Sequence, residues 1–521
     1  MQRDSSSWRQ AAALSTALAL LLQGCVVARG VKVEAVGPQT GSEPLKVTSP
    51  VKAHLKDGST VVFAKGVTVT RALVRGDGMS YDLDLAHRRP VSELKLEDVA
   101  AIERYDYEVD AAATAGLSIL MVAGVAAATA AGTVAIFGSC PTVYSGPGKA
   151  ARLEAEVFSY SIVPLFEARD LDRLSAGVDA SGSLRLEVRN EALETHYINQ
   201  MQLVEVRHAA GEAVMPGPSG GPLVVGPLAS ARAAVSRDGA DLAATLAVSD
   251  GEAVRASAAR LAAAGASDLD DWIDLTFDAP PGSDRAALVL RARSSLLNTV
   301  LFYDVMLADA GFHAVDWMAG LGRISNAVEL GRFFRKHMGL RVLELRDGRH
   351  HEIARVPDPG PIAWHDVAVS VPLRPGQREV RLRLESVADA WRIDSAMLAG
   401  SARRAAARVY PVAEAVGARG NAEPAALRSL RTADRDYLRT SPGQRVVLRF
   451  DPAPLAPGER RTFLLGSQGY YTEWLRGDWL RAERPRVFVP GEAALVEALS
   501  RWREQMGSME ARFETLRVPV I

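Results

Sequence analysis

In three stretches of the chain, apolar and charged residues alternate with a period of two. Of all the features of the sequence, this alternation limits the possible folds most. In residues 184–189 and 380–385, leucine and valine alternate with arginine and glutamate, and residues 446–450 follow much the same pattern. Successive side chains of a β-strand point to opposite faces, so each stretch has one apolar and one charged face. This is typical of antiparallel sheets that pack face to face. The sequence therefore predicts a mainly β protein.

The length and charge of the chain limit its organisation and its partners. Its 521 residues are too many for one compact core, so we expect two to four domains. A hydrophobic content of 48% with 24% charged residues is typical of a globular protein. The 61 basic and 62 acidic residues give a net charge of −1, which disfavours a nucleic-acid partner.

Residues 1–24 have the pattern of a secretory signal peptide. Arg3 and Arg9 precede an uncharged run over 11–22, which is too short to span a membrane. The run ends in Leu22-Gln23-Gly24-Cys25, which resembles the lipobox of bacterial lipoproteins. That resemblance implies that Cys25 is lipidated and that the membrane is a partner through the lipid anchor. A plain signal peptide with a chance cysteine is the alternative.

Two further residues bear on the anchor. Position 26 is valine rather than aspartate, which by resemblance to Gram-negative lipoproteins favours the outer membrane. The other cysteine, Cys140, has no partner in the chain if Cys25 carries lipid. A Cys25–Cys140 disulfide is the alternative.

A hydrophobic helix rich in glycine and alanine is predicted over 109–138. Residues 111–137 carry no charge, and Gly116, Gly124 and Gly132 recur every eight residues, which lets another helix approach closely. The run is long enough to cross a bilayer. Insertion in a membrane and packing on protein remain equal alternatives.

A small barrel domain is predicted over 25–108. Short strands are expected at 51–55, 60–63, 67–74, 79–85 and 94–102. Asp57-Gly58 indicates a hairpin, and residues 76–78 indicate a second turn. Residues 94–103 resemble the closing strand of SH3-like or Sm-like barrels in bacterial envelope proteins.

Two helices are predicted among the later strands. One is an insertion over 315–338, with Asn326 as its cap and Glu329 three residues later. The other is a C-terminal amphipathic helix, whose apolar residues lie at 499, 502, 506, 509 and 513. We expect the second helix to dock on the last domain.

Scattered segments between 139 and 480 resemble known exported domains. Residues 140–144, 189–191 and 194–198 are similar to a β-domain of bacterial surface proteins, which implies a β-rich domain over 139–265. Residues 297–303, 391–394 and 469–474 look like strands of a galactose-binding-like jelly roll, which implies a jelly roll over 266–400. A C-terminal β domain with its helix follows over 401–521. Residues 145–148 depart from the first family's longer glycine turn. Neither resemblance implies a substrate.

One segment imitates a catalytic motif. Gly217-Pro218-Ser219-Gly220-Gly221 matches the glycine-flanked serine of hydrolases and is similar to the nucleophile loop of chymotrypsin-like proteases. A hydrolase elbow needs a strand before the serine and a helix after it, which the prolines oppose. The protease version needs an acidic residue where Pro218 stands. We therefore interpret the segment as a loop and assign no catalytic residue.

Metal and cofactor motifs are absent from the sequence. His350 and His351 are interpreted as a surface loop, and the nine histidines form no zinc motif. Asp268, Asp270 and Asp271 could offer oxygens to Ca²⁺, but a solvated charge run is the preferred interpretation. No cofactor and no metal are expected.

Four aromatic residues are the candidate ligand site. Tyr470, Tyr471, Trp474 and Trp479 could stack on sugar rings, although core residues that tie the last strand to the C-terminal helix are the preferred interpretation. The sequence thus predicts a lipid-anchored envelope protein that is a non-catalytic binding or scaffolding module, with a glycan or an envelope protein as partner. A carbohydrate-binding surface lipoprotein is the alternative, and a serine hydrolase is the third.

Overall fold

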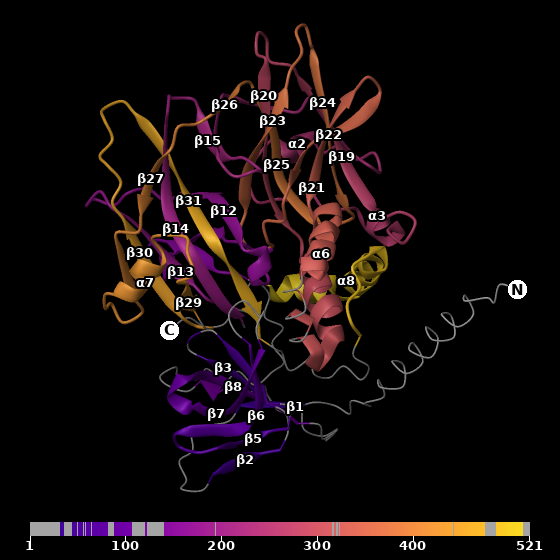
Figure 1. Cartoon of the computed structure of the whole chain (residues 1–521). Helices are drawn as coiled ribbons and strands as arrows, with labels where there is room; N and C mark the ends of the chain where they lie inside the picture. Colours follow the sequence, from indigo (N-terminus) through magenta and orange to yellow (C-terminus); the bar gives the residue numbers. More distant parts are fainter. Residues whose placement is uncertain are drawn as a thin grey trace, which may run out of the picture.

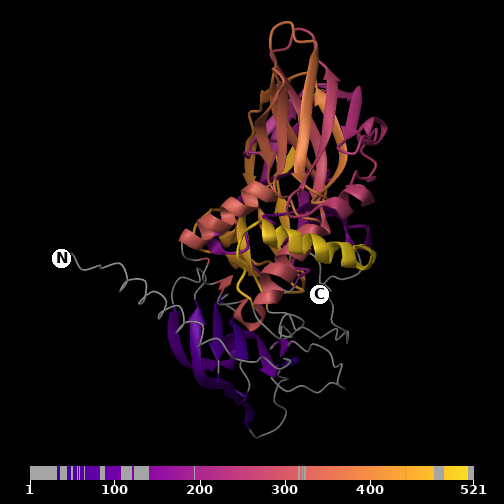
Figure 2. The same cartoon turned by 90° about the vertical axis from the view of Figure 1, so that its right-hand side faces the viewer.

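The computed structural model shows an N-terminal sheet and two joined β-sandwiches, with two long helices across one end of the sandwiches (Figures 1 and 2). The structure describes residues 32–35, 44–48, 51–106 with gaps at 56, 58, 64 and 82–87, 120–121, 140–192, 194–314, 317–318, 321, 324–440, 442–474 and 486–513. The prediction of a mainly β protein with antiparallel sheets is confirmed. Cys25 and residues 1–24 lie outside the described residues.

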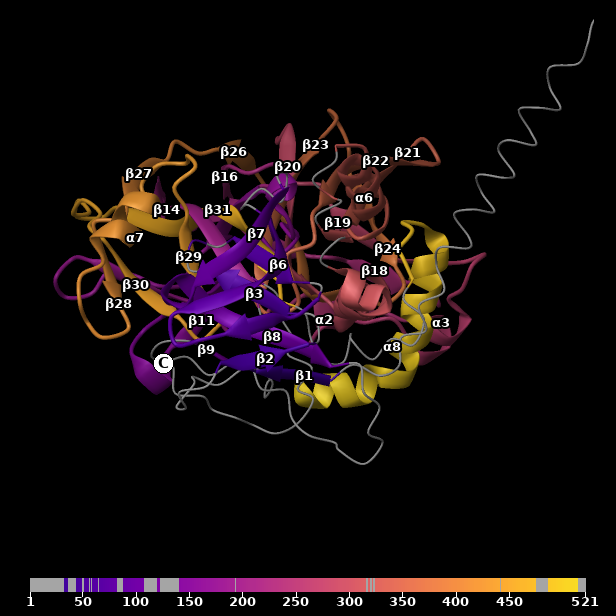
Figure 3. The same cartoon turned by 60° about the horizontal axis from the view of Figure 1, so that its bottom comes forward.

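The N-terminal sheet is antiparallel and has nine strands in the order β1-β8-β3-β4-β6-β5-β2, with β7 beside β6 and β9 beside β8. Its strands are β1 (Lys32–Ala35), β2 (Leu45–Val47), β3 (Val51–Leu55), β4 (Thr60–Phe63), β5 (Val67–Val69), β6 (Leu73–Tyr81), β7 (Arg88–Lys95), β8 (Val99–Asp106) and β9 (Leu120–Met121). They enclose a small core of their own, with Phe63 and Val74 fully buried. Figure 3 shows this sheet from the side that faces away from the sandwiches.

Local predictions for this sheet are confirmed in one place and wrong in two. The hairpin at Asp57 joins β3 to β4, with Val51 opposite Phe63. The predicted turn at 76–78 lies inside β6, where the register shifts between Arg75 and Gly78. Glycine occurs there because a Cβ on Gly78 would lie 2.6 Å from the Phe63 ring. The predicted strand 94–102 is divided by the 3₁₀ turn Leu96–Asp98 into parts of β7 and β8.

The predicted hydrophobic helix over 109–138 falls almost wholly outside the described residues. The two residues of that run that are described, Leu120 and Met121, form β9, which pairs with Ala101 and Ile102. At these two positions the helix prediction is wrong. None of the helices that the structure describes is long and apolar enough to cross a membrane.

The first sandwich is built from two distant parts of the chain. One sheet has the order β11-β10-β13-β30-β28 and the other β12-β31-β14-β27, with β29 beside β14. The early strands are β10 (Thr142–Ser145), β11 (Arg152–Glu156), β12 (Ala168–Arg173), β13 (Leu184–Arg189) and β14 (Glu194–His208). The late strands are β27 (Arg408–Pro411), β28 (Glu414–Gly417), β29 (Leu438–Thr440), β30 (Arg445–Phe450) and β31 (Arg460–Glu473). The expected division into domains 139–265 and 401–521 therefore differs from the observed pairing.

The second sandwich is inserted between those two parts. One sheet has the order β17-β25-β20-β23 and the other β18-β19-β24-β21-β22. The first consists of β17 (Leu228–Ser230), β20 (Arg285–Ser294), β23 (His365–Pro372) and β25 (Trp391–Ala399). The second consists of β18 (Ala233–Ser236), β19 (Asp270–Asp278), β21 (Leu340–Arg346), β22 (Arg349–Val356) and β24 (Glu379–Val387). A small sheet of β15 (Ala213–Pro216), β16 (Pro222–Val225) and β26 (Ala402–Arg404) connects the two sandwiches.

The predicted strand at 297–303 is helical, which corrects the jelly-roll assignment there. Helix α4 (Leu296–Thr299) continues into the π-helix Val300–Leu307 and the 3₁₀ helix Ala308–His313. Ser295 caps α4 by accepting a hydrogen bond from the Leu297 amide. A continuous apolar run has no period that separates a buried strand from a buried helix, so the sequence was ambiguous. Residues 391–394, by contrast, are the start of β25, as predicted.

Two long helices cover the ends of the strands, and both differ from their predictions. Helix α6 (Ile324–His337) begins after 315, so Asn326 lies in its first turn rather than at its cap. Helix α8 (Glu492–Arg512) packs on α4 and the π-helix of the second sandwich, not on the strands of 401–473. Shorter helices are α2 (Ala243–Leu246), α3 (Ala258–Ala263) and α7 (Pro424–Ser429). One hydrophobic core extends through both sandwiches, from Val143 to Phe513.

Candidate functional site

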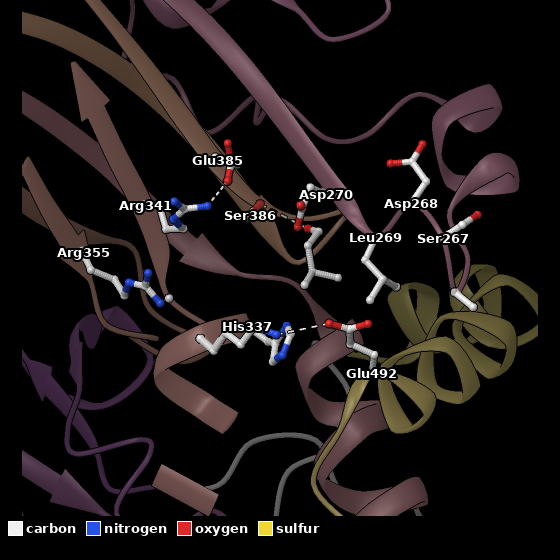
Figure 4. A pocket seen from close by; sticks show the side chains of 14 residues that line it. Ser267, Asp268, Leu269, Asp270, His337, Arg341, Arg355, Glu385, Ser386 and Glu492 are labelled. Carbon is white, nitrogen blue, oxygen red and sulfur yellow. Dashed lines mark hydrogen bonds and ion pairs between the residues drawn. The ribbon is translucent and has the colours of Figure 1, made fainter. Parts of the chain in front are cut away.

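A polar groove of about 520 Å³ lies where the second sandwich meets α6 and α8 (Figure 4). Its walls come from the loop 266–269 before β19, from strands β21, β22 and β24, and from the ends of the two helices that face each other. The groove is therefore formed by segments that are far apart in the sequence. Figure 4 shows Arg341 and Arg355 on one side, with Glu385 beside Arg341, and Asp268 and Glu492 on the other.

The basic wall is held by cross-strand pairing. Arg341 on β21 lies opposite Arg355 on β22 and opposite Glu385 on β24. Arg341 donates to Glu352 at 2.9 Å and to Glu385. Arg355 donates to the same Glu352 carboxylate at 2.8 Å, and its guanidinium, followed by that of Arg341, holds the pKa of Glu352 below its usual range. The two guanidiniums are thus fixed in place by carboxylates.

The acidic wall is a short turn that arginines hold from behind. Arg237 makes two parallel hydrogen bonds to Asp268, at 2.6 and 2.8 Å, and Arg260 adds a third at 3.3 Å. The Arg237 hydrogen bond keeps the pKa of Asp268 below its usual value. Asp270 is exposed, and no ion pair among the described residues includes it. Its carboxylate is therefore the charge in the groove with which a ligand could pair.

The helix ends complete the groove. Lys336 on α6 donates to Glu492 on α8 at 3.1 Å, which joins the two helices across the opening. Burial and the adjacent Lys336 lower the pKa of His337, so its imidazole is neutral at pH 7. A neutral imidazole can donate one hydrogen bond and accept one.

The groove is lined by charged, hydroxyl and imidazole side chains. A hydrolytic site needs a nucleophile within hydrogen-bond reach of a base, and a third group to orient that base. In the described part of the chain, no hydrogen bond joins Ser267 or Ser386 to His337. Within the same part, no group of three or more His, Cys, Asp or Glu side chains could hold a metal ion. The arrangement can bind a polar molecule through several charged hydrogen bonds.

The aromatic candidates lie elsewhere, and three of the four are buried. Tyr470, Tyr471 and Trp474 are 0%, 1% and 1% exposed, and Trp479 lies outside the described residues. Tyr470 stacks on Tyr197 of β14 with ring centroids 4.5 Å apart. The buried rings belong to the first sandwich and are not brought to the groove.

Trp474 contacts the N-terminal sheet rather than the C-terminal helix. Its ring stacks on His54 of β3 with centroids 4.2 Å apart, and its indole nitrogen donates to Thr195 at 2.9 Å. Trp474 therefore lies where the N-terminal sheet meets the first sandwich.

The serine motif forms the tip of a hairpin. Pro216 of β15 lies opposite Pro222 of β16, and the Gly217 amide donates to the Gly221 carbonyl at 2.9 Å. Ser219 is exposed at this tip. The segment is a strand-turn-strand unit, whereas a nucleophile elbow requires a strand followed by a helix.

The other flagged polar residues are also placed. His350 and His351 are exposed on β22, immediately after the turn at Asp347 and Gly348, whose φ values of 50° and 75° are those of a type I′ hairpin turn. They lie in a strand, not in a loop as predicted. Two of the aspartates considered as calcium ligands, Asp268 and Asp270, line the groove. Asp268 is already hydrogen-bonded to arginines there.

Sequence reasoning missed the charged residues that line the groove on its strands. Arg341, Arg355 and Glu385 occupy the charged faces of strands, and this pattern is also typical of any solvated sheet face. The tight spacing of Asp268 and Asp270 before Trp272 was the one signal in the sequence that pointed to this region.

Comparison with known proteins adds no family. No family model matches the chain, and no curated protein matches it. Among solved structures, the chain is similar to one described as "Structure of infectious bursal disease virus Gt strain". The two are 10% identical, the match covers 72% of this chain and 87% of that chain, and the TM-score is 0.11. A similarity of that size carries no argument about fold or function.

Proposed function

We propose that the protein is a lipid-anchored component of the bacterial cell envelope that acts as a non-catalytic binding or scaffolding module. The anchor would be Cys25, at the end of the lipobox-like Leu22-Gln23-Gly24-Cys25, with the outer membrane as its location. The N-terminal sheet would be an SH3-like barrel, and the second sandwich a galactose-binding-like jelly roll. Both would serve as rigid scaffolds for loops and grooves.

The groove is the observation that carries the binding function. Its volume of about 520 Å³ lies within the usual range for small-molecule sites. Arg341 and Arg355 are held by Glu352, and Asp268 by Arg237, so these groups would lose little side-chain freedom on binding. Prepositioned charged groups of both signs suit a polar ligand with hydroxyl, ammonium or carboxylate groups.

A carbohydrate ligand is the second candidate, and the composition of the groove favours it. Carboxylates, guanidiniums and the hydroxyls of Ser267 and Ser386 line one small volume. Such groups can each make hydrogen bonds to neighbouring sugar hydroxyls. This would place sugar recognition at the groove instead of at the buried Tyr470, Tyr471 and Trp474.

Binding at the groove can be tested with Asp270→Asn. The full chain would be screened against a glycan array and, by thermal shift, against a panel of amino acids. A hydrogen bond to a charged group is worth about 1.5–3 kcal/mol, so Asp270→Asn should weaken binding of any hit by roughly 10- to 100-fold.

Asp347→Asn is the matched control, because Asp347 is an exposed aspartate in the β21–β22 turn. It should bind like the unmodified chain. A hit that both variants bind with unchanged affinity would place the ligand site outside the groove.

A further inference from the structure

The two sandwiches meet at a joint that contains the buried carboxyl groups of Glu156 and Asp172 and the half-buried ones of Asp170 and Asp358. On the first sandwich the joint consists of β11 and β12, and on the second it consists of residues 358–366, which lead into β23. We call this contact the joint. Its charged groups lie away from the groove and take no part in the proposed ligand site.

Glu156 is the central residue of the joint. It is 3% exposed, and one carboxyl oxygen accepts hydrogen bonds from the backbone amides of Ile362 and Ala363, at 2.6 and 3.2 Å. The other oxygen accepts from the thiol of Cys140 at 3.0 Å. No ion pair among the described residues includes Glu156, so nothing in this part of the chain neutralises its charge directly.

The backbone of the second sandwich comes unusually close to this carboxyl group. Gly360 has a φ of +89°, and a Cβ at that position would lie 2.4 Å from the carboxyl carbon of Glu156. Only glycine fits both the backbone conformation and the contact. Glycine at position 360 therefore allows residues 360–363 to pack directly on Glu156.

A second cluster lies beside it, on β12. Asp170 accepts a hydrogen bond from the Phe158 amide, and Asp172 contacts the Nδ1 atom of His365 at 3.1 Å. Burial, reinforced by the charges of both aspartates, raises the pKa of Tyr160. At the rim of the joint, Arg173 and Arg291 both donate to Asp366, at 3.0 and 3.1 Å.

A small cavity of about 50 Å³ adjoins the joint, lined by residues of both sandwiches. Asn298 donates to the side chain of Asp358 at 2.7 Å, while its own buried carbonyl oxygen has no hydrogen-bond partner among the residues that the structure describes. Ser159 and Tyr160 line the opposite wall. A cavity of this size has room for water beside the polar atoms of Asn298 and Asp358.

The electrostatics of the joint favour the neutral forms of these acids. Burial raises the pKa of Glu156 to about 7, and burial also raises the pKa of Asp358. Burial, reinforced by the charge of Asp172, raises the pKa of Asp170. For His365, burial lowers the pKa, but the hydrogen bond from its ring to Asp172 and the nearby acidic charges outweigh burial and raise it.

We propose that the joint is a proton-dependent latch, closed when Glu156 and Asp170 are protonated and loosened when they ionise. Ionised Glu156 would be a buried charge near Asp358, and ionised Asp170 would lie beside Asp172. Both situations are costly in a low-dielectric interior. Residues 358–363 then move off β11 and water reaches the carboxylates.

The direction of the pH dependence follows from the carboxyl groups. Between pH 4.5 and about 7, Glu156 keeps its proton when the joint is closed. When the joint is open and Glu156 is in water, it loses that proton. The population of the open joint therefore rises with pH across this window and levels off above it. Mildly acidic conditions favour the closed joint.

Hydrogen exchange of the backbone amides of Gly360, Ile362 and Ala363 in the full chain tests the latch. After correction for the chemical exchange rate, exchange should rise by up to about tenfold per pH unit for each carboxyl that ionises, until the rise ends near pH 7. Glu156→Gln, which cannot ionise, should remove much of this rise. Glu154→Gln is the matched control, because Glu154 is buried on the same strand and accepts hydrogen bonds from Ser145 and Ser175 within the first sandwich.

The outcomes separate clearly. The latch is supported if the rise of the exchange rate with pH is lost in Glu156→Gln and kept in Glu154→Gln. It is overturned if all three proteins show the same rise, or if the unmodified chain shows none. If Glu156→Gln does not fold, Asp170→Asn and infrared spectra of the unmodified chain replace it. Loss of a protonated carboxyl band between pH 5 and pH 8 together with a reduced exchange slope in Asp170→Asn supports the proposal. Absence of that band throughout contradicts it.

Discussion

Gly78 shows how one residue without a side chain fixes the geometry of the N-terminal sheet. The edge of the Phe63 ring occupies the place where a Cβ would be, at 2.6 Å. Phe63 itself is fully buried in the small core of this sheet. The sequence pattern Gly-Asp-Gly predicted a turn, because glycine-rich dipeptides usually occur in turns. Glycine occurs here for a different reason, which is the close approach of an aromatic ring to a strand.

Gly78→Ala should therefore destabilise the N-terminal sheet by about 1–3 kcal/mol, the usual cost of overpacking a filled core. The measurement is urea-induced unfolding of the full chain, followed by a probe in this sheet such as the fluorescence of a label on Asp77→Cys.

Gly177→Ala provides the control, because no heavy atom lies within 4 Å of a Cβ built there. If Gly78→Ala proves as stable as Gly177→Ala, the ring does not pack against β6 as described.

Trp502 is the residue that docks helix α8, and it determines which sandwich the helix belongs to. It is fully buried, and its indole nitrogen donates to Asp389 at 2.7 Å, immediately before β25. Arg392 donates to the same carboxylate at 2.8 and 3.1 Å. The helical period of apolar residues predicted this helix from the sequence. The period could not tell on which surface the apolar face would pack.

Two variants separate the packing of Trp502 from its hydrogen bond. Trp502→Ala should lower the free energy of unfolding by about 3–5 kcal/mol, because it leaves a large cavity in the shared core. Trp502→Phe keeps most of the buried area and should cost about 1–3 kcal/mol, since it leaves Asp389 short of one donor.

Chemical denaturation monitored by circular dichroism gives both values, with Glu504→Ala at an exposed position of α8 as the control. Equal stability of Trp502→Phe and the unmodified chain would show that the bond to Asp389 contributes nothing.

The other elements show where a period in the sequence is sufficient. Strands β13, β24 and β30 follow their period-two patterns, with the apolar residues Leu186, Leu382 and Leu448 buried at 2% exposure or less. The run 297–303 had no such period and became helical. Residues 94–102 were split because Leu96–Asp98 turn the chain within an otherwise apolar-polar alternation. Local patterns therefore predicted single strands correctly. They did not predict the turn at 96–98 or the fully buried helical run at 297–303.

At the scale of the whole molecule, the order of domains along the chain could not be read from the sequence. The pairing of β30 with β13 joins Leu184 with Phe450, 266 positions further along the chain, and β31 runs between β12 and β14. No local pattern encodes such pairing, because it depends on which hydrophobic faces meet in three dimensions. The same limit applies to the groove, whose walls come from residues between 266 and 492.

The insertion of one sandwich into the other also accounts for the joint. Because the chain leaves the first sandwich after β14 and returns at β27, the second sandwich is tethered at two points and packs against β11 and β12. Residues 358–366 reach Glu156 and Asp172 only through this arrangement. Neither cluster of carboxyl groups gave a signal in the sequence, since their members are isolated acidic residues on strands.

The proposed lipid on Cys25 would hold the protein in the cell envelope. The most direct test is metabolic labelling with a radioactive or alkyne-bearing palmitate in a Gram-negative host, comparing the unmodified chain with Cys25→Ser. We expect the unmodified chain to carry the label, to lose residues 1–24 and to fractionate with outer membranes. Cys25→Ser should remain an unlabelled precursor, while Cys140→Ser, which changes the other cysteine, should be labelled like the unmodified chain. Equal labelling of Cys25→Ser and the unmodified chain, or no label on either, would show that Cys25 is not lipidated.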